Sequence, residues 1–249
     1  MIAHSSMRVS LAVLLFVATP ALADERLLSR IGCGDQASFY APYALPIADA
    51  ALEGGALRIL VVGSSSTAGT GAGAKDSAYP ARTRADLNDA RIAVVARGKG
   101  GETAKGALAR MMSEIDQYRP DLVVWQVGTN DALRRLDPRD VAETIRDGLE
   151  LIRAGGDDVL LVDPQYFPKS ERNPRYIAMI EMMERLGAQQ DVMVVRRYAR
   201  MKLADDEVDA LLARDGLHMS RAGHECLARD LAAAIRAGLP ENSEALRAD

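Results

Sequence analysis

The chain has 249 residues, of which 48 % are apolar and 27 % charged, and its formal net charge is −4 at pH 7. This balance is typical of a globular protein and excludes the collagen-like, wholly disordered and small disulfide-stapled classes. A slightly acidic chain also lacks the large basic surface with which proteins bind nucleic acid, so we expect no nucleic-acid partner.

The first 23 residues predict a secretory signal peptide. Arg8 precedes an apolar run over residues 11–17, and the small-x-small triplet Ala-Leu-Ala follows at 21–23. This order is typical of a signal that is cleaved after Ala23. The alternative is an uncleaved anchor helix, although the run is shorter than the ~20 residues that a membrane span needs. We therefore expect a secreted or periplasmic protein with no transmembrane segment after cleavage.

The two cysteines, Cys33 and Cys226, lie near the two ends of the mature chain. In an oxidising compartment they can pair and tie these ends together. The alternative is two separate buried thiols, because a free cysteine packs well as a small apolar residue. The sequence leaves both open.

Residues 24–56 have no clear hydrophobic period, and we interpret them as an irregular N-terminal arm. Residues 57–238 form the predicted catalytic domain, and residues 239–249 a polar tail. Within the domain, short apolar runs bounded by turn residues predict buried strands. These runs are Leu57–Val62, Ile92–Ala96, Leu122–Val127, Val159–Val162 and Val192–Val195.

Helical patterns lie between and after these runs, several of them opened by proline or by a capping residue. They cover residues 80–88, 103–118, 138–153, 173–186, 204–213 and 221–237. Strands that alternate with helices predict an α/β fold with a mainly parallel sheet and helices on both faces. In such sheets, functional sites form at the carboxyl ends of the strands.

Hydroxyl, amide and glycine residues occur at these predicted strand ends. Ser64, Ser65 and Ser66 follow the first strand, and a serine that is activated by a base can act as a nucleophile. Glycines in residues 98–103 expose backbone N–H groups at a helix start, and Asn130 after the third strand can donate its amide to an oxyanion. Each feature alone is also compatible with ordinary loop and turn chemistry.

A base is available from only two histidines in the mature chain. Asp215 precedes His218 by three residues, a spacing at which the carboxylate can hydrogen-bond the imidazole and fix its tautomer. His224 falls inside the last predicted helix, and we interpret it as a packed or surface helix residue.

Together these residues resemble the SGNH, or GDSL-like, hydrolase family of esterases, lipases and thioesterases. The block Gly-Ser-Ser at 63–65 matches the family's Gly-Asp-Ser block, which makes Ser65 the nucleophile by register. Asp215 and His218 match the Asp-x-x-His block and complete the triad. Ser64 replaces the family's aspartate, so the support of this loop is expected to differ, and Ser64 and Ser66 remain alternative nucleophiles.

The resemblance also implies an oxyanion hole. Its donors are the backbone N–H groups of Ser65 and Gly101 and the side-chain amide of Asn130. The family implies a three-layer α/β/α fold with a flavodoxin-like sheet of about five strands, and metal-free hydrolysis without a cofactor. We also expect Gln165, after the fourth strand, to contact the substrate; loop packing is the alternative.

The expected function is therefore the hydrolysis of carboxylic esters through an acyl-enzyme. The substrate is a small-molecule or glycan-linked acyl ester, and small acyl or acetyl esters are favoured because no broad apolar lid is visible. Carboxylesterase, lysophospholipase and thioesterase activities all fit these residues. The alternative is an O-acyl transferase or a glycan-binding accessory protein. A nucleotide-binding loop is disfavoured because the glycines at 69–73 lie too far from the strand end, and a zinc site because the chain has too few histidines.

Overall fold

The computed structural model describes residues 20–35 and 43–239. The predicted signal sequence lies outside these residues up to position 19, as does almost all of the predicted tail. None of the helices in the described residues combines the length and the apolar character that a membrane crossing requires.

The centre of the fold is a five-stranded sheet in which every pairing is parallel. Its strands are β1 (Leu57–Gly63), β2 (Ile92–Gly98), β3 (Leu122–Gln126), β4 (Asp158–Val162) and β5 (Met193–Val195). Their spatial order is β2-β1-β3-β4-β5. This is the flavodoxin-like order, so the predicted fold class is confirmed.

Four strands are as buried as their apolar runs predict, and β2 is not. The burial of β2 is mixed along its length, because it lies at the edge of the sheet and pairs only with β1. The expectation of a buried strand there is therefore wrong for most of its residues.

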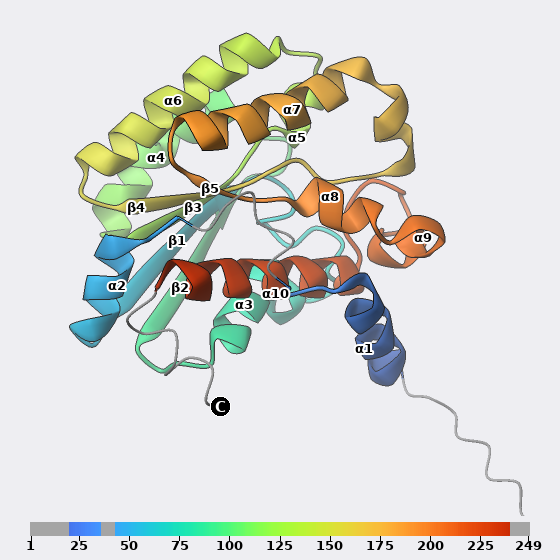
Figure 1. Cartoon of the computed structure of the whole chain (residues 1–249), viewed down its shortest axis with the longest axis horizontal. Coiled ribbons are helices and arrows are strands. Elements are labelled where there is room, and N and C mark those ends of the chain that lie inside the picture. The colour runs from blue at the N-terminus through green and yellow to red at the C-terminus, as the bar shows by residue number, and fades with distance from the viewer. Residues whose placement is uncertain (1–19, 36–42, 240–249) are drawn as a thin grey trace, which may run out of the picture.

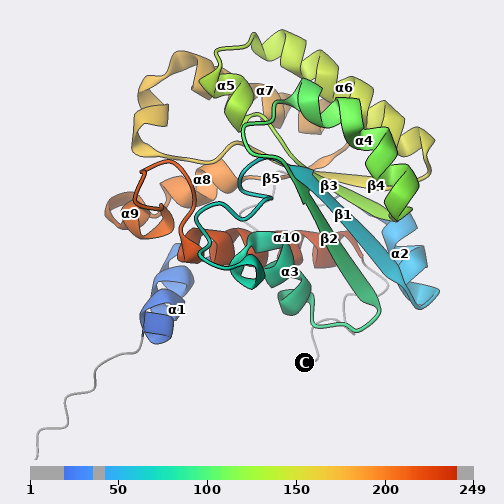
Figure 2. The ribbon, with the colours of Figure 1, turned by 180° about the vertical axis from the view of Figure 1, so that it is seen from behind.

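Two layers of helices cover the sheet (Figures 1 and 2). One face carries α4 (Ala104–Tyr118), α6 (Pro138–Ala154) and α7 (Pro174–Gln189), and the other carries α3 (Tyr79–Leu87) and α10 (Arg221–Gly238). Local sequence explains where these helices begin. Thr103, Asn173 and Ser220 accept hydrogen bonds from backbone N–H groups of the first turns that they cap, which satisfies donors that have no partner within the helix.

Short helices gather at the carboxyl ends of the strands: α5 (Thr129–Leu133), α8 (Arg197–Lys202) and α9 (Val208–Leu211). The helix expected over 204–213 is wrong. A 3-10 turn over Asp205–Glu207 precedes the single turn of α9. Asp205 has φ of +45°, and this left-handed backbone together with three successive acidic residues interrupts a regular helix.

The N-terminal segment is not the irregular arm that we expected. It contains α1 (Pro20–Ile31) and α2 (Pro46–Glu53). Leu27, Leu28 and Ile31 are buried and belong to the main hydrophobic core, so α1 packs through one apolar face. A disulfide joins Cys33, just after α1, to Cys226 in α10 across a sequence separation of 193. The two cysteines are therefore paired.

Candidate active site

The turn after β1 distinguishes the three consecutive serines. The Ser64 hydroxyl donates to Gln126 Oε1 at 3.3 Å, and the Ser66 hydroxyl donates to Gln165 Oε1 at 3.2 Å. Both side chains are buried. Ser65 is only half-buried, and in the described part of the chain neither its hydroxyl nor its N–H has a protein hydrogen-bond partner. Ser65 is thus the serine that is open to a substrate.

Gln126, the last residue of β3, supports this turn from beneath. Its Oε1 accepts from the backbone N–H of Ser64 at 3.0 Å and from the hydroxyl of Thr67 at 3.3 Å. Sequence reasoning missed Gln126, although a polar residue that ends a buried apolar strand is a usable signal. Its contacts support the Gly-Ser-Ser block at 63–65, in which Ser64 occupies the position of the family's aspartate.

The loop between β2 and α4 presents the predicted oxyanion glycine. Gly101 has φ of +73°, a conformation that favours glycine. Among the described residues its N–H donates to no protein acceptor. The Asn130 amide donates one hydrogen to Glu102 O at 2.9 Å. An asparagine amide carries two hydrogens, so this contact fixes the amide and leaves the second hydrogen for a ligand.

Asp215 and His218 lie together in the loop before α10. His218 Nδ1 is 2.6 Å from Asp215 Oδ2. Asp215 Oδ1 accepts from the backbone N–H groups of Leu217 and His218 at 3.0 and 2.9 Å. The His218 hydrogen bond and these two N–H donors lower the pKa of Asp215 to about 2. An ionised carboxylate can only accept, so Nδ1 carries the proton and Nε2 is the free basic nitrogen.

Gln165 connects the serine turn to the histidine loop. Its Oε1 accepts from the Ser66 hydroxyl, and its Nε2 donates to Leu217 O. Ser65 and His218 are therefore each one residue from an end of this bridge. Gln165 is 2 % exposed, and both ends of its amide bind protein. This favours the packing alternative, and the substrate contact stays a prediction.

A buried guanidinium that sequence reasoning missed lies under the same turn. Arg197 is 1 % exposed. It donates to the hydroxyls of Ser66 and Thr129, each at 3.2 Å, and to Asp163 O at 2.8 Å. Burial raises the pKa of the Asp163 carboxyl to about 7. Arg197, the first residue of α8, lies in no recognisable motif, so nothing in the sequence indicated its burial.

His224 is fully buried in α10 and is not a second base. Its Nδ1 accepts from Tyr79 N at 3.2 Å and its Nε2 lies 3.1 Å from Thr70 O. Burial lowers the pKa of His224 to about 4, so the ring is neutral and its partners fix its tautomer. This agrees with the interpretation of a packed helix residue.

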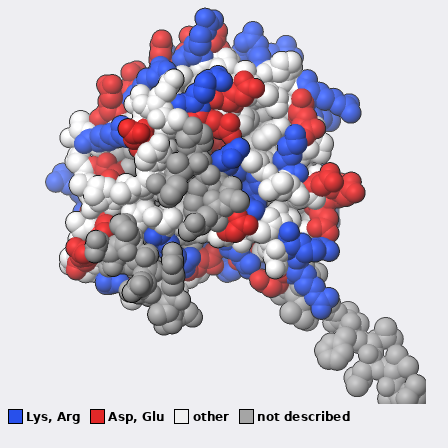
Figure 3. Space-filling view, viewed as in Figure 1, with Lys and Arg blue, Asp and Glu red and all other residues white. Residues whose placement is uncertain are grey.

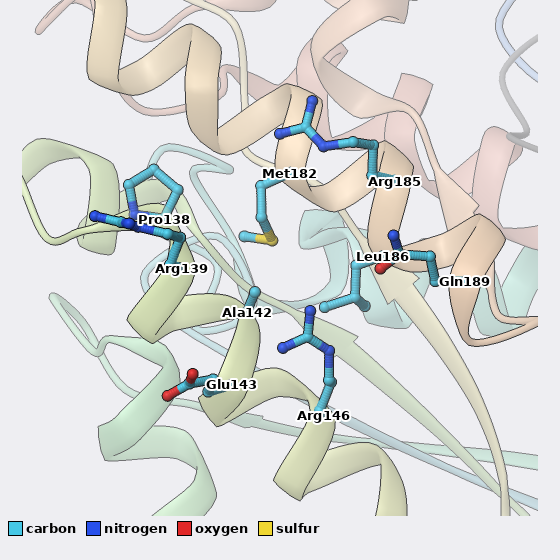
Figure 4. Close-up of a pocket in the computed structure, with 9 residues that line it drawn as sticks. All are labelled: Pro138, Arg139, Ala142, Glu143, Arg146, Met182, Arg185, Leu186 and Gln189. Carbon is cyan, nitrogen blue, oxygen red and sulfur yellow. The ribbon is translucent and has the colours of Figure 1, made fainter.

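The strand ends form a small recess lined by Ser64, Glu102 and Asn130 among others. A larger pocket of about 340 Å³ lies between α6 and α7 (Figure 4), lined by Met182, Arg185 and others, and includes none of the predicted site residues.

On the face in Figure 3, basic and acidic side chains are interspersed. Within residues 20–35 and 43–239, no group of three or more His, Cys, Asp and Glu side chains can hold a metal ion.

Comparison with known proteins identifies the family of this chain. The model of the non-GDSL lipase-like family matches residues 33–241. An arylesterase of Vibrio mimicus is 27 % identical over 163 residues, which is 65 % of this chain and 79 % of that protein. Esterase TesA of Pseudomonas aeruginosa is 30 % identical over 130 residues, 52 % of this chain and 62 % of that protein. A crystal structure of TesA superposes with a TM-score of 0.63 at 28 % identity, covering 72 % of this chain and 97 % of that one.

Proposed function

Because the chain belongs to the non-GDSL lipase-like family and is an ester hydrolase of the esterase and thioesterase type, we propose that it cleaves esters through an acyl-enzyme on Ser65. The observation that carries this proposal is the contact of Asp215 with His218 Nδ1, which leaves Nε2 basic. The accessible hydroxyl of Ser65, between two buried serines, supports its role as the nucleophile.

In the proposed reaction these residues have the following roles. His218 Nε2 takes the proton of Ser65 as its oxygen attacks the ester carbonyl, and Asp215 stabilises the imidazolium. The N–H groups of Ser65 and Gly101 and the second amide hydrogen of Asn130 stabilise the negative oxygen of the tetrahedral intermediate. His218 then protonates the leaving alcohol. Water attacks the acyl-enzyme with His218 as the base, and the carboxylic acid and free Ser65 result.

We propose that the substrates are small acyl or acetyl esters, free or attached to a glycan. The sequence shows no broad apolar lid, and this supports small acyl groups. A secreted or periplasmic location is supported by the predicted signal sequence and by the Cys33–Cys226 disulfide, since structural disulfides persist in oxidising compartments.

The test is hydrolysis of p-nitrophenyl acetate, butyrate and octanoate by the mature protein and by Ser65→Ala. Loss of a triad nucleophile costs several powers of ten in kcat. Ser64→Ala is the matched control, because it removes a neighbouring hydroxyl that is buried against Gln126. We expect activity in the control, none in Ser65→Ala, and a rate that falls with chain length. Equal rates in Ser65→Ala and the unaltered protein would refute the assignment.

A further inference from the structure

Three side chains at α5 contact backbone groups of the loop that carries Gly101. The Asn130 amide donates to Glu102 O at 2.9 Å, and the Asp131 carboxylate accepts from Ala104 N at 3.0 Å. Arg134, the residue that follows α5, donates from Nη2 to Gly101 O at 2.7 Å. The resemblance to known hydrolases assigned a role only to Asn130, so Asp131 and Arg134 are unexplained by it.

Arg134 is exposed, and it completes the restraint of one peptide unit. The carbonyl of Gly101 accepts from Arg134, and the N–H of the same peptide unit, on Glu102, donates to Lys99 O at 3.1 Å. The Lys99 N–H in turn donates to Gly63 O at 3.0 Å. The peptide that follows Gly101 is therefore held at both ends and tied back to β1.

This restraint matters because the two glycines of the loop add no stiffness of their own. Gly100 and Gly101 are adjacent, and glycine rotates through more backbone conformations than any other residue. Hydrogen bonds must therefore keep Gly101 at its φ of +73°; one lies within the loop, and the bond from Arg134 comes from outside it. A small rotation there turns the Gly101 N–H away from the oxyanion position, and a misplacement of about 1 Å in an active site can cost ~10²-fold in rate.

We propose that Arg134 is a positioning residue for the oxyanion hole: by holding the Gly101 carbonyl, it keeps the Gly101 N–H directed at the transition state. The inference rests on the proposed function, because it assigns Gly101 to that hole. Arg134 acts through Gly101 and not through the ester. Its removal therefore lowers kcat and leaves substrate binding nearly unchanged.

The test compares Arg134→Gln and Arg134→Lys with Arg135→Gln. Arg135 is the adjacent exposed arginine, and the bond to the Gly101 carbonyl comes from Arg134. We expect Arg134→Gln to lower kcat about 10- to 100-fold with KM nearly unchanged. Lysine is expected to recover part of the loss, since it retains a donor, and Arg135→Gln to stay near the parent rate. Equal losses in Arg134→Gln and Arg135→Gln would indicate a general charge effect and overturn the proposal.

Amide hydrogen exchange provides a second readout that does not depend on catalysis. We expect Arg134→Gln, and not Arg135→Gln, to speed exchange at the amides of residues 100–104, because the loop loses one of its anchors. Unchanged exchange together with an unchanged kcat would refute the positioning role. If Ser65→Ala still hydrolyses esters, the proposed function fails, and the exchange result still decides whether Arg134 holds this loop.

Discussion

Asp215 Oδ2 lies 2.6 Å from His218 Nδ1, three residues further along the chain. The same carboxylate accepts the backbone N–H groups of Leu217 and His218 through its other oxygen. One side chain thus fixes both the turn of the loop and the tautomer of the imidazole. The three hydrogen bonds lower the pKa of Asp215 to about 2, so it stays ionised above about pH 3. A loss of activity on mild acidification must therefore be caused by protonation of another group.

Asp215→Asn separates these two tasks. The asparagine oxygen can still accept from the two backbone N–H groups, so the turn is retained. Its NH₂ group, however, faces Nδ1 and favours the wrong tautomer, and we expect kcat to fall on the order of 10⁴-fold. The measurement is kcat with p-nitrophenyl acetate. Asp116→Asn, at an exposed position of α4, is the control. A loss below tenfold would contradict the assigned role of Asp215.

Gln165→Leu tests whether the bridge positions the two loops. The change removes the acceptor of the Ser66 hydroxyl hydrogen, although the Ser66 oxygen still accepts from Arg197, and it removes the donor to the Leu217 carbonyl. A buried polar group left unsatisfied costs about 1–3 kcal/mol. We expect a lower free energy of unfolding and a reduced kcat with little change in KM. Steady-state kinetics and urea unfolding check both. A raised KM with normal kcat would instead restore the substrate contact that the sequence suggested.

Asp163 predicts a pH dependence of stability. Burial raises its folded-state pKa to about 7, against about 3.9 in an unfolded chain. The folded state therefore binds the proton more tightly, and the stability from this group is full below about pH 4 and lost as the pH rises through 7. Asp163→Asn retains an oxygen that can accept from Tyr198 N, which bonds Asp163 Oδ1 at 2.9 Å.

We therefore expect the unfolding free energy of the parent, relative to Asp163→Asn, to fall between pH 4 and pH 7.5. Urea unfolding across this range measures the difference. A difference that stays flat, or that rises with pH, would show that Asp163 does not bind a proton on folding.

Replacing Cys33 and Cys226 by serine tests the disulfide. Removing a disulfide from a folded domain typically costs about 2–4 kcal/mol. Because the bond lies between the end of α1 and α10 and not at the strand ends, we expect kcat to change little at 25 °C. Thermal unfolding with and without reductant measures the loss. A parent protein whose Tm is unaffected by reduction would contradict the pairing.

Hydrophobic pattern alone predicted the sheet and the longer helices, because these are set by burial along single segments. Leu57 begins both the predicted and the observed β1, and Ser220 caps α10 as expected. The short helices were missed because their positions depend on contacts made after the fold has formed. The α5 turn, for example, is held by bonds from Asn130 and Asp131 to the neighbouring loop.

The candidate site divides in the same way. Residues in short motifs, such as Asp215 and His218, were found from their spacing, and the structure brings them into contact. Gln126 and Arg197 have no motif, and their importance comes from burial beneath the serine turn. A single sequence does not reveal which distant polar side chains share one buried network. Gln165 was noticed for its place after a strand, but its bonds to Ser66 and Leu217 could not be predicted for the same reason.

The positions of Cys33 and Cys226 have a consequence for damage to the enzyme. Ser65, Gly101, Asn130 and the Asp215–His218 pair all lie between the two cysteines in the chain. The whole candidate catalytic set therefore belongs to one covalently closed ring. A protease that cuts a single exposed loop inside this ring opens it without releasing a fragment. The nicked molecule therefore still holds all of its catalytic groups in one covalently linked unit. Only reduction of the disulfide would remove the covalent link between the two pieces.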